Sequence, residues 1–341
     1  MTWYIDQGPD SDVIISSRVR LARNLTRYPF PHKMDKAQSA EVATEITSAF
    51  FRKNKERKRD FLELDLSCLP VEDRESLVEK RLISEALAQR TESGRAIISR
   101  DESFSLMINE EDHIRIQSMK AGFDLQNAYR EAYIVALSLE ESLPLAYSEQ
   151  YGFLTACPTN TGTGMRASVM AHLPGLVQIG SIRPLLEGLG KMGFTVRGQY
   201  GEGSKAGGNL FQISNQLTLG LSEEDLLSDL TRIVQQLIEQ EREARQKLYQ
   251  QQPIEIEDRA RRALATLRNA RLMTTEEAQK LISDVRLGNA LGILYDVTPQ
   301  TLNRIVANIG PASIQKANGR QLNAHERDIA RSTMIRDLLG S

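Results

Sequence analysis

The chain has 341 residues, more than twice the ~150 residues of a typical domain, so we expect one large and one smaller domain. Its 43 Lys and Arg residues and 45 Asp and Glu residues leave a net charge of −2. General binders of nucleic acids or membrane surfaces carry a basic excess, so this balance disfavours both classes.

The N-terminal residues and the cysteines indicate the compartment. The first residues do not resemble a signal peptide, and no apolar run approaches the ~18 residues of a membrane span. The two cysteines, Cys68 and Cys157, lie far apart, which fits a reducing compartment better than a disulfide framework. We therefore expect a cytoplasmic protein without a membrane partner or a direct nucleic-acid partner.

Two patterns divide the chain near Pro253. Residues 1–250 alternate short β-like runs with helical stretches, whereas residues 254–341 show almost only helical periodicity. We therefore predict domains at 1–250 and 254–341. Short connections join most of the β-like runs, as in an antiparallel sheet. The runs are 12–16, 95–99, 103–108, 194–198 and 209–214. The predicted fold class is α+β, with an antiparallel sheet flanked by helices and an all-helical C-terminal domain.

Arginines and carboxylates recur in short constrained segments of the first domain. Arg18 and Arg20 are two residues apart in a strand-like run, so their side chains share a face and can meet one polyphosphate. Glu111 and Glu202 each lie beside an arginine segment. Two carboxylates facing one pocket can hold a guanidinium planar and take its proton as it reacts. The alternatives are exposed strand charges and ordinary ion pairs.

A glycine loop follows a short strand predicted at Phe153. Cys157 opens the loop, Gly162 and Gly164 lie within it, and we expect a helix to start near Arg166 and to end at residue 174. A helix start there would offer N–H groups to phosphate and favour the Cys157 thiolate, the alternative being a buried inert cysteine. A dinucleotide fingerprint matches only loosely, and a P-loop is absent from the sequence. A second glycine-rich segment, 198–208, is predicted to be a mobile lid.

Helix signals dominate the remainder of the chain. Ser222 and Asp225 form a capping box at the start of a long helix, whose charged end at 239–247 we expect to be solvated. The tail has signals for three or four helices, starting after Thr274, Thr298 and Asn323. Their apolar residues can form a small core or a surface for a second copy of the chain.

Four long segments then resemble, in the same order, the phosphagen kinase superfamily and especially its bacterial protein-arginine kinases of the McsB type. The segments are VIISSRVRLARNL, NEEDHIRIQ, YGFLTACPTNTGTGMRASVMAHLP and RGQYGEGSKAGGNLFQISNQLTLG. The resemblance implies a phosphagen-kinase-like catalytic domain in which Glu111 and Glu202 grip the substrate guanidinium, with Cys157 close by. It also implies ATP, with Mg²⁺ carried by ATP and no separate metal site. The implied ATP contacts are Ser16, Ser17, Arg18, Val19, Arg20, Arg81, Arg115, Arg166, Ala167, Ser168, Val169, Met170, Arg197, Gly198, Gln199, Tyr200, Gly201 and Glu202.

The resemblance favours protein-bound arginine as the substrate. SSRVR begins at residue 16, which leaves no room for the N-terminal domain of the metabolite kinases, and extra helices follow the catalytic segments. The last helix resembles the family's RDxxRA motif for sensing phosphoarginine, and the alternative is a solvated charged helix. We expect Arg327 and Arg331 to form a repulsive pair that a bound dianion relieves. The implied allosteric residues are Arg327, Asp328, Ile329, Ala330, Arg331 and Ser332.

Three positions depart from the family pattern. Arg81 stands where the family usually has His in its nucleotide contacts, Lys205 stands in the lid where Glu is usual, and Ser332 replaces the final Ala of the motif. The resemblance therefore leaves open whether the residue at position 81 contacts ATP and how the lid binds a basic substrate.

The predicted function is transfer of the ATP γ-phosphoryl group to arginine side chains of proteins, within stress response and protein quality control. The alternatives are a kinase of free arginine or a related metabolite, and a non-catalytic phosphoarginine-binding adaptor. The resemblance further implies a zinc-finger adaptor activator (McsA type), a heat-shock repressor among the substrates, a Clp-type protease downstream, and a homodimer or larger homo-oligomer.

Overall fold

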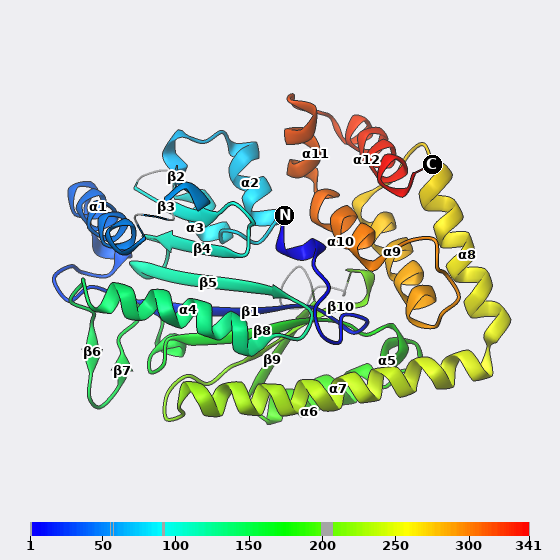
Figure 1. Cartoon of the computed structure of the whole chain (residues 1–341), viewed down its shortest axis with the longest axis horizontal. Helices are drawn as coiled ribbons and strands as arrows, with labels where there is room; N and C mark the ends of the chain where they lie inside the picture. Colours follow the sequence, from blue (N-terminus) through cyan, green and yellow to red (C-terminus); the bar gives the residue numbers. More distant parts are fainter. Residues whose placement is uncertain (1, 55, 57, 91–92, 199–206, 341) are drawn as a thin grey trace.

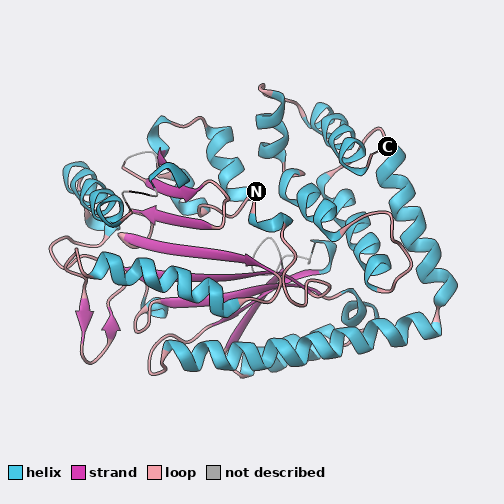
Figure 2. Cartoon of the chain, viewed as in Figure 1, coloured by secondary structure: helices cyan, strands magenta, loops and turns pink. Residues whose placement is uncertain are grey.

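The computed structural model describes residues 2–54, 56, 58–90, 93–198 and 207–340. Its centre is an eight-stranded sheet in the order β2-β3-β4-β5-β1-β8-β10-β9, and neighbouring strands are all antiparallel. Helices lie around the sheet, and residues 253–340 contain helices but no strand (Figure 1, Figure 2). The predicted α+β class, with an antiparallel sheet and a helical C-terminal region, is confirmed.

The sheet strands and a separate two-stranded hairpin have the following bounds: β1 Ile14–Arg23, β2 Phe61–Asp65, β3 Arg95–Ser99, β4 Phe104–Ile108, β5 Ile114–Ala121, β6 Tyr147–Ser148, β7 Gly152–Phe153, β8 Met165–His172, β9 Phe194–Gly198 and β10 Leu210–Asn215. The α-helices are α1 Lys36–Lys53, α2 Val71–Glu79, α3 Glu85–Gln89, α4 Leu125–Glu140, α5 Pro174–Gln178, α6 Ile182–Lys191, α7 Glu223–Gln251, α8 Pro253–Asn269, α9 Thr275–Ala290, α10 Pro299–Asn308, α11 Pro311–Asn318 and α12 Ala324–Leu339. The short 3₁₀ turns used below are η1 Trp3–Ile5, η5 Pro158–Asn160 and η6 Gly207–Asn209.

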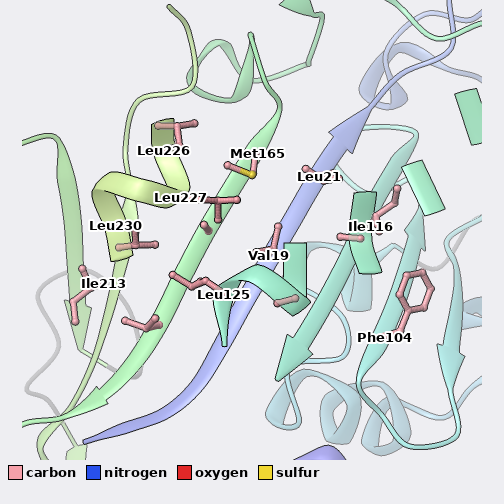
Figure 3. Packing of buried hydrophobic residues seen from close by; sticks show 14 of the residues in the cluster. Val19, Leu21, Phe104, Ile116, Leu125, Met165, Ile213, Leu226, Leu227 and Leu230 are labelled. Atoms are coloured by element: carbon pink, nitrogen blue, oxygen red, sulfur yellow. The ribbon is translucent and has the colours of Figure 1, made fainter. Parts of the chain in front are cut away.

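Strand alternation gives the central sheet an apolar face and a polar face. Val19 and Leu21 of β1 are fully buried, and helices α4 and α7 pack over the face to which they point. Figure 3 shows Leu226 and Leu230 of α7 packing beside the strand that carries Met165. Because side chains alternate along a strand, the residues between these apolar positions point to the opposite face. The polar face is therefore the one available for a binding site.

The segment 165–172 is a strand, so the predicted helix start near Arg166 is wrong. β8 pairs with β1 on one side and with β10 on the other, and seven of its eight residues are buried. A short continuous apolar run fits a fully buried strand as well as a buried helix, which is why periodicity misled. The helix begins only at Pro174, the first residue of α5. Arg166 therefore lies on a sheet, away from any helix N-terminus.

The long helix α7 begins as predicted, with a complete capping box between Ser222 and Asp225. Its charged end is not solvated throughout, because Glu241 and Arg245 are 0% and 3% exposed. Glu241 accepts hydrogen bonds from the backbone N–H groups of Gly175 and Leu176, at 2.8 and 2.9 Å, and pairs with Arg245 at 2.6 Å. Glu241 thus connects α7 to the start of α5. Both charged side chains can be buried because each has hydrogen-bond partners.

The tail contains five helices, α8 to α12, where three or four were predicted. The predicted starts at Thr274, Thr298 and Asn323 are confirmed as N-caps of α9, α10 and α12. Gly310 follows the C-cap of α10 and is the N-cap of α11, whose first residue is a proline, and no helix start was predicted there. Apolar side chains of these helices form a core of their own, including Ile282, Leu302 and Ile305. No helix of the described residues is long and apolar enough to cross a membrane.

The C-terminal helices dock against the sheet portion through polar contacts. Glu79 at the end of α2 accepts hydrogen bonds from the backbone N–H groups of Ala312 and Ser313, both at 2.8 Å, and so caps α11. His172 of β8 is within 2.8 Å of the Ser283 hydroxyl of α9. Figure 1 shows these helices, drawn yellow to red, gathered at one end of the sheet. The tail therefore lies next to the polar face.

Candidate active site

Strand register places four arginines on the polar face of the sheet. Arg18 and Arg20 project from β1, and Arg166 of β8 lies directly opposite Arg20. Arg115 of β5 lies opposite Ala22, which has the same orientation as Arg20 because it is two residues further along β1. Residues far apart in the sequence therefore form one basic surface. The spacing within one strand had predicted a shared face only for Arg18 and Arg20.

Arg197 extends this surface to the far edge of the sheet. It lies opposite Gln212 of β10, which lies opposite Met170 of β8, which in turn lies opposite Ser16 of β1. Each of these cross-strand neighbours has the same orientation, so Arg197 faces the same side as Arg18. We call Arg18, Arg20, Arg115, Arg166 and Arg197 the arginine row.

Within the described part of the chain, burial and neighbouring arginines act together on the guanidinium groups of the row. Burial, followed by Arg81, Arg115 and Arg166, lowers the pKa of Arg18 to about 9. Burial, followed by Arg18, Arg115 and Arg166, also lowers the pKa of Arg20, and Glu110 counteracts them. The Arg20 Nε is buried and has no hydrogen-bond partner among the described residues. A polyanion placed here would relieve the repulsion and supply the missing acceptors, so the donor set fits a polyphosphate.

Glu110 holds Arg115 in this row. Its carboxylate is 2.6 Å from Arg115 Nη1 and accepts a hydrogen bond from the Ser84 hydroxyl at 2.6 Å. Burial alone would raise the pKa of Glu110, but Arg115 and the hydrogen bonds bring it below the ordinary value. Glu110 is therefore charged and committed to Arg115, which leaves the adjacent Glu111 for another task.

Glu111 and Cys157 lie beside the row. The Cys157 side chain is a neighbour that lowers the pKa of Glu111, and its Sγ is 3.0 Å from the Thr159 hydroxyl. Burial, then Asp112 and Glu110, raise the pKa of Glu111, with Arg115 and Cys157 opposing the rise. A carboxylate with a raised pKa is better suited to accept a proton from a nucleophile than an ordinary one.

The surroundings of Cys157 differ from those expected. Cys157 is half-buried and precedes η5, a three-residue 3₁₀ turn, so it does not lie at the N-terminus of an α-helix. Instead, Asp112 fixes the loop, because its Oδ1 accepts hydrogen bonds from Asn24 Nδ2 at 2.6 Å and from the Ala156 N–H at 2.7 Å. The sequence analysis missed Asn24 and Asp112. The NEEDH segment offered a signal for Asp112 alone, since a third consecutive carboxylate needs a partner.

A pocket of about 110 Å³ opens beside the row at its Arg18 end. Arg18 and Arg81 line it, and the carbonyl of Arg81 accepts a hydrogen bond from Gln117 at 2.7 Å. Arg81 has a positive φ of 61°, an uncommon conformation for a non-glycine residue. Among the residues expected to contact ATP, the pocket collects Ser16, Arg18, Arg81, Ser168, Val169 and Met170.

Other residues expected at the ATP site point elsewhere. Val19 and Ala167 are 0% exposed in the apolar core, and Val169, although it borders the pocket, belongs to the same core at 1% exposed. Ser17 donates to the Gly122 carbonyl and accepts from the Asp124 N–H, so its hydroxyl is also committed to the apolar side. Side chains alternate between the two faces of a strand, so only every second residue of the expected ATP-binding segments can reach a ligand through its side chain. The segment Gln199 to Glu202 and Lys205 lie outside the described residues; Gly198 ends β9.

The α12 motif does not form the expected repulsive pair. Arg331 is 2% exposed and donates hydrogen bonds to the carbonyls of Ile309 and Met273, both at 2.7 Å, and to Asp328 at 2.6 Å. Arg327 is half-buried and donates to the Leu322 carbonyl at 2.8 Å. The four-residue spacing puts both arginines on one side of the helix, but only Arg331 enters the interior. The remaining motif residues differ: Ile329 is exposed, Ala330 is half-buried and Ser332 is buried.

Two family models match the chain. The ATP:guanido phosphotransferase C-terminal catalytic domain matches residues 41–244, and the protein-arginine kinase McsB C-terminal domain matches residues 253–341. Within the described residues, no group of three His, Cys, Asp or Glu side chains lies together as a metal site would require.

Full-length relatives and solved structures are also similar. A protein-arginine kinase of Desulforamulus reducens is 44% identical over 340 residues, covering 99% of this chain and 95% of its own. One of Pelotomaculum thermopropionicum is 45% identical over 338 residues, covering 98% and 94%. The duplicated taurocyamine kinase of Schistosoma mansoni, solved with transition-state analogue components, has a TM-score of 0.59 and 30% identity, over 67% of this chain and 33% of its own. The present chain thus spans about a third of that duplicated kinase. Lombricine kinase shares the fold, with a TM-score of 0.59 and 23% identity over 71% of each chain.

Proposed function

Because the chain belongs to the ATP:guanido phosphotransferase family, with a C-terminal region of the protein-arginine kinases, we propose that it transfers the γ-phosphoryl group of ATP to arginine side chains of proteins. The observation that carries this proposal is the meeting of Glu111 and Cys157 beside the arginine row. A base for a guanidinium and donors for a polyphosphate then lie within one site.

The arginine row acts on the phosphates. Its guanidinium groups are held by the sheet before ATP arrives, so they meet the charge of the transferring group without reorganisation. Mg²⁺ carried with ATP would add neutralising charge to the phosphate oxygens. Arg81 contributes a further cation at the pocket, in the position where the family has His. The side chains of Ser16, Ser168 and Met170 border the remainder of the nucleotide.

Glu111 acts on the substrate guanidinium. It orients the attacking nitrogen and accepts its proton while that nitrogen bonds to the γ-phosphorus and the bond to the bridging oxygen of ADP breaks. Cys157 neighbours Glu111 and borders the substrate. We assign the second clamp to Glu202 and further ATP contacts to Gln199 through Gly201, all outside the described residues. Arg197, which precedes them on β9, belongs to the arginine row.

The finer expectations belong to this proposal as well. The spans of the two family models support a catalytic domain to about residue 250 and a helical domain beyond Pro253. We assign phosphoarginine sensing to the exposed side of residues 327–332, and homo-oligomer formation to the helical domain. A zinc-finger adaptor of the McsA type, a heat-shock repressor among the substrates, a Clp-type protease downstream and a cytoplasmic location complete the proposed setting.

An assay of acceptor choice tests the proposal. The full chain is incubated with MgATP and either an arginine-rich protein or free arginine, and the products are analysed by mass spectrometry at neutral pH, because phosphoarginine is acid-labile. Phosphate on protein arginine, formed faster than free phosphoarginine, supports the proposal. Faster use of free arginine would make the chain a metabolite kinase, and binding of phosphoarginine without turnover would make it an adaptor.

A further inference from the structure

The C-terminal helices form one wall of the pocket beside Arg18. Arg286 of α9 and Asn303 and Val306 of α10 line it, together with Tyr4 of η1. The opposite wall is the polar face of the sheet, with Ser16, Met170 and Gln212 at neighbouring positions of β1, β8 and β10. A ligand in the pocket therefore touches both the sheet and the tail.

Arg286 is the charged group of that wall. It is 9% exposed, and its Nη2 donates to Asn303 Oδ1 at 2.7 Å, while Asn303 Nδ2 donates to the Tyr4 carbonyl at 3.0 Å. Burial lowers the pKa of Arg286 to about 10, and no carboxylate of the described residues counteracts this shift. A buried cation without a counter-ion is costly unless a ligand supplies acceptors. Asn303 holds one donor of the guanidinium fork and thereby fixes its orientation.

The position of Arg286 identifies the part of the ligand that it meets. Glu111 and Cys157 mark the end of the site where transfer occurs, near Arg115. The pocket lies toward the other end of β1: Ser16 is four residues from Arg20, or about 13 Å at the usual rise of a strand. A nucleotide with its terminal phosphate at the transfer end therefore has its nucleoside in the pocket.

We infer that Arg286, oriented by Asn303, binds the nucleoside end of ATP, so that the C-terminal helices complete the nucleotide pocket. The inference rests on the ATP-dependent function proposed above. The guanidinium offers planar donors and a flat face, which suit the acceptor atoms and the ring of a purine. The same helix α9 contacts β8 through Ser283 and His172, so this wall is fastened to the sheet at a second point.

Binding of three probes to the full chain tests this inference. Dissociation constants for ATP, AMP and inorganic tripolyphosphate are measured for the parent, for Arg286→Gln and for the matched control Arg304→Gln. Arg304 is an exposed arginine next to Asn303 on α10, outside the pocket. We expect Arg286→Gln to weaken ATP and AMP about 10-fold or more, as for loss of a hydrogen bond to a charged group. Tripolyphosphate, which lacks a nucleoside, should bind unchanged, and Arg304→Gln should match the parent for all three probes.

The outcomes separate the inference from the proposed function. A parent that binds no ATP contradicts the proposed function itself. A parent that binds ATP, with Arg286→Gln equal to it for ATP and AMP, contradicts only the role of Arg286, and so does an equal loss for tripolyphosphate. If Arg286→Gln fails to fold, Asn303→Ala decides: weaker AMP with unchanged tripolyphosphate supports the inference, and unchanged AMP overturns it.

Discussion

At the residue scale, the site works by giving neighbouring carboxylates different tasks. Glu110 is paired with Arg115, Asp112 holds the Ala156 backbone, and Glu111 is left with a thiol as its partner. Burial, together with the like charges on both sides, raises the pKa of Glu111 and so makes it harder to ionise than an isolated glutamate. The same three consecutive residues therefore supply a structural ion pair, a loop anchor and the proposed base.

The raised pKa of Glu111 has a consequence for the pH dependence of activity. A base works only when deprotonated, so kcat/KM should fall as the pH drops through this raised pKa, at a higher pH than an ordinary glutamate would give. Asp112→Asn removes one neighbouring charge but keeps an oxygen that accepts from Asn24 and Ala156. We predict that its acid limb moves to lower pH in a kcat/KM profile. An acid limb at the same pH in both proteins would show that another group titrates.

Arg166 should tolerate lysine poorly. Its Nε and Nη2 donate to the Ser214 hydroxyl at 3.3 and 3.1 Å, an arrangement that uses the planar fork. Lysine keeps the charge but loses this geometry, so Arg166→Lys should lower kcat/KM for ATP by about 10-fold or more. Steady-state kinetics measure the effect, with Arg183→Lys on the exposed side of α6 as the control. Equal values for both variants would remove Arg166 from phosphate binding.

At the element scale, several strands and the starts of four helices could be predicted, but the arrangement of these elements could not. Strand runs such as 95–99 and 194–198 match β3 and β9, and the caps of α7, α9, α10 and α12 are local signals that short segments carry. β8 was predicted wrongly, because an apolar run reads alike in a buried strand and a buried helix. The arginine row depends on register between distant strands, which no single segment contains.

The burial of Arg331 in the α12 motif could not be predicted from the sequence either, and it leads to a test. Arg331 makes its hydrogen bonds inside the helical domain, so Arg331→Ala should remove roughly 3 kcal/mol of stability by leaving Asp328 and two carbonyls without their partner. Arg327→Ala should change the thermal midpoint little, yet abolish any response of activity to added phosphoarginine if sensing resides in this helix. Thermal unfolding and activity with phosphoarginine distinguish the two variants. An unaltered response in Arg327→Ala would place the sensor elsewhere, and an unaltered midpoint in Arg331→Ala would contradict its structural role.

At the scale of the whole molecule, the two parts of the chain meet around the pocket at Arg18, where we propose that the nucleotide binds. The sheet supplies the arginine row, and the helical tail supplies Arg286 and the wall that faces it. Glu79, which links α2 to α11, lies only two residues before Arg81, which lines the pocket. The same short segment therefore contacts the tail and borders the pocket. A change in the helical domain thus has a direct physical route to the pocket.

The most direct test of the central claim, a guanidinium phosphotransfer with Glu111 as base, compares the parent with Glu111→Gln. Both proteins are supplied with MgATP and an arginine-rich protein, and phosphoarginine is counted by mass spectrometry at neutral pH while ATP affinity is measured separately. The account predicts phosphoarginine from the parent, a rate lower by roughly 10²-fold or more in Glu111→Gln, and similar ATP affinity in both. Nearly full turnover in Glu111→Gln, or phosphate from the parent only on serine, would contradict it.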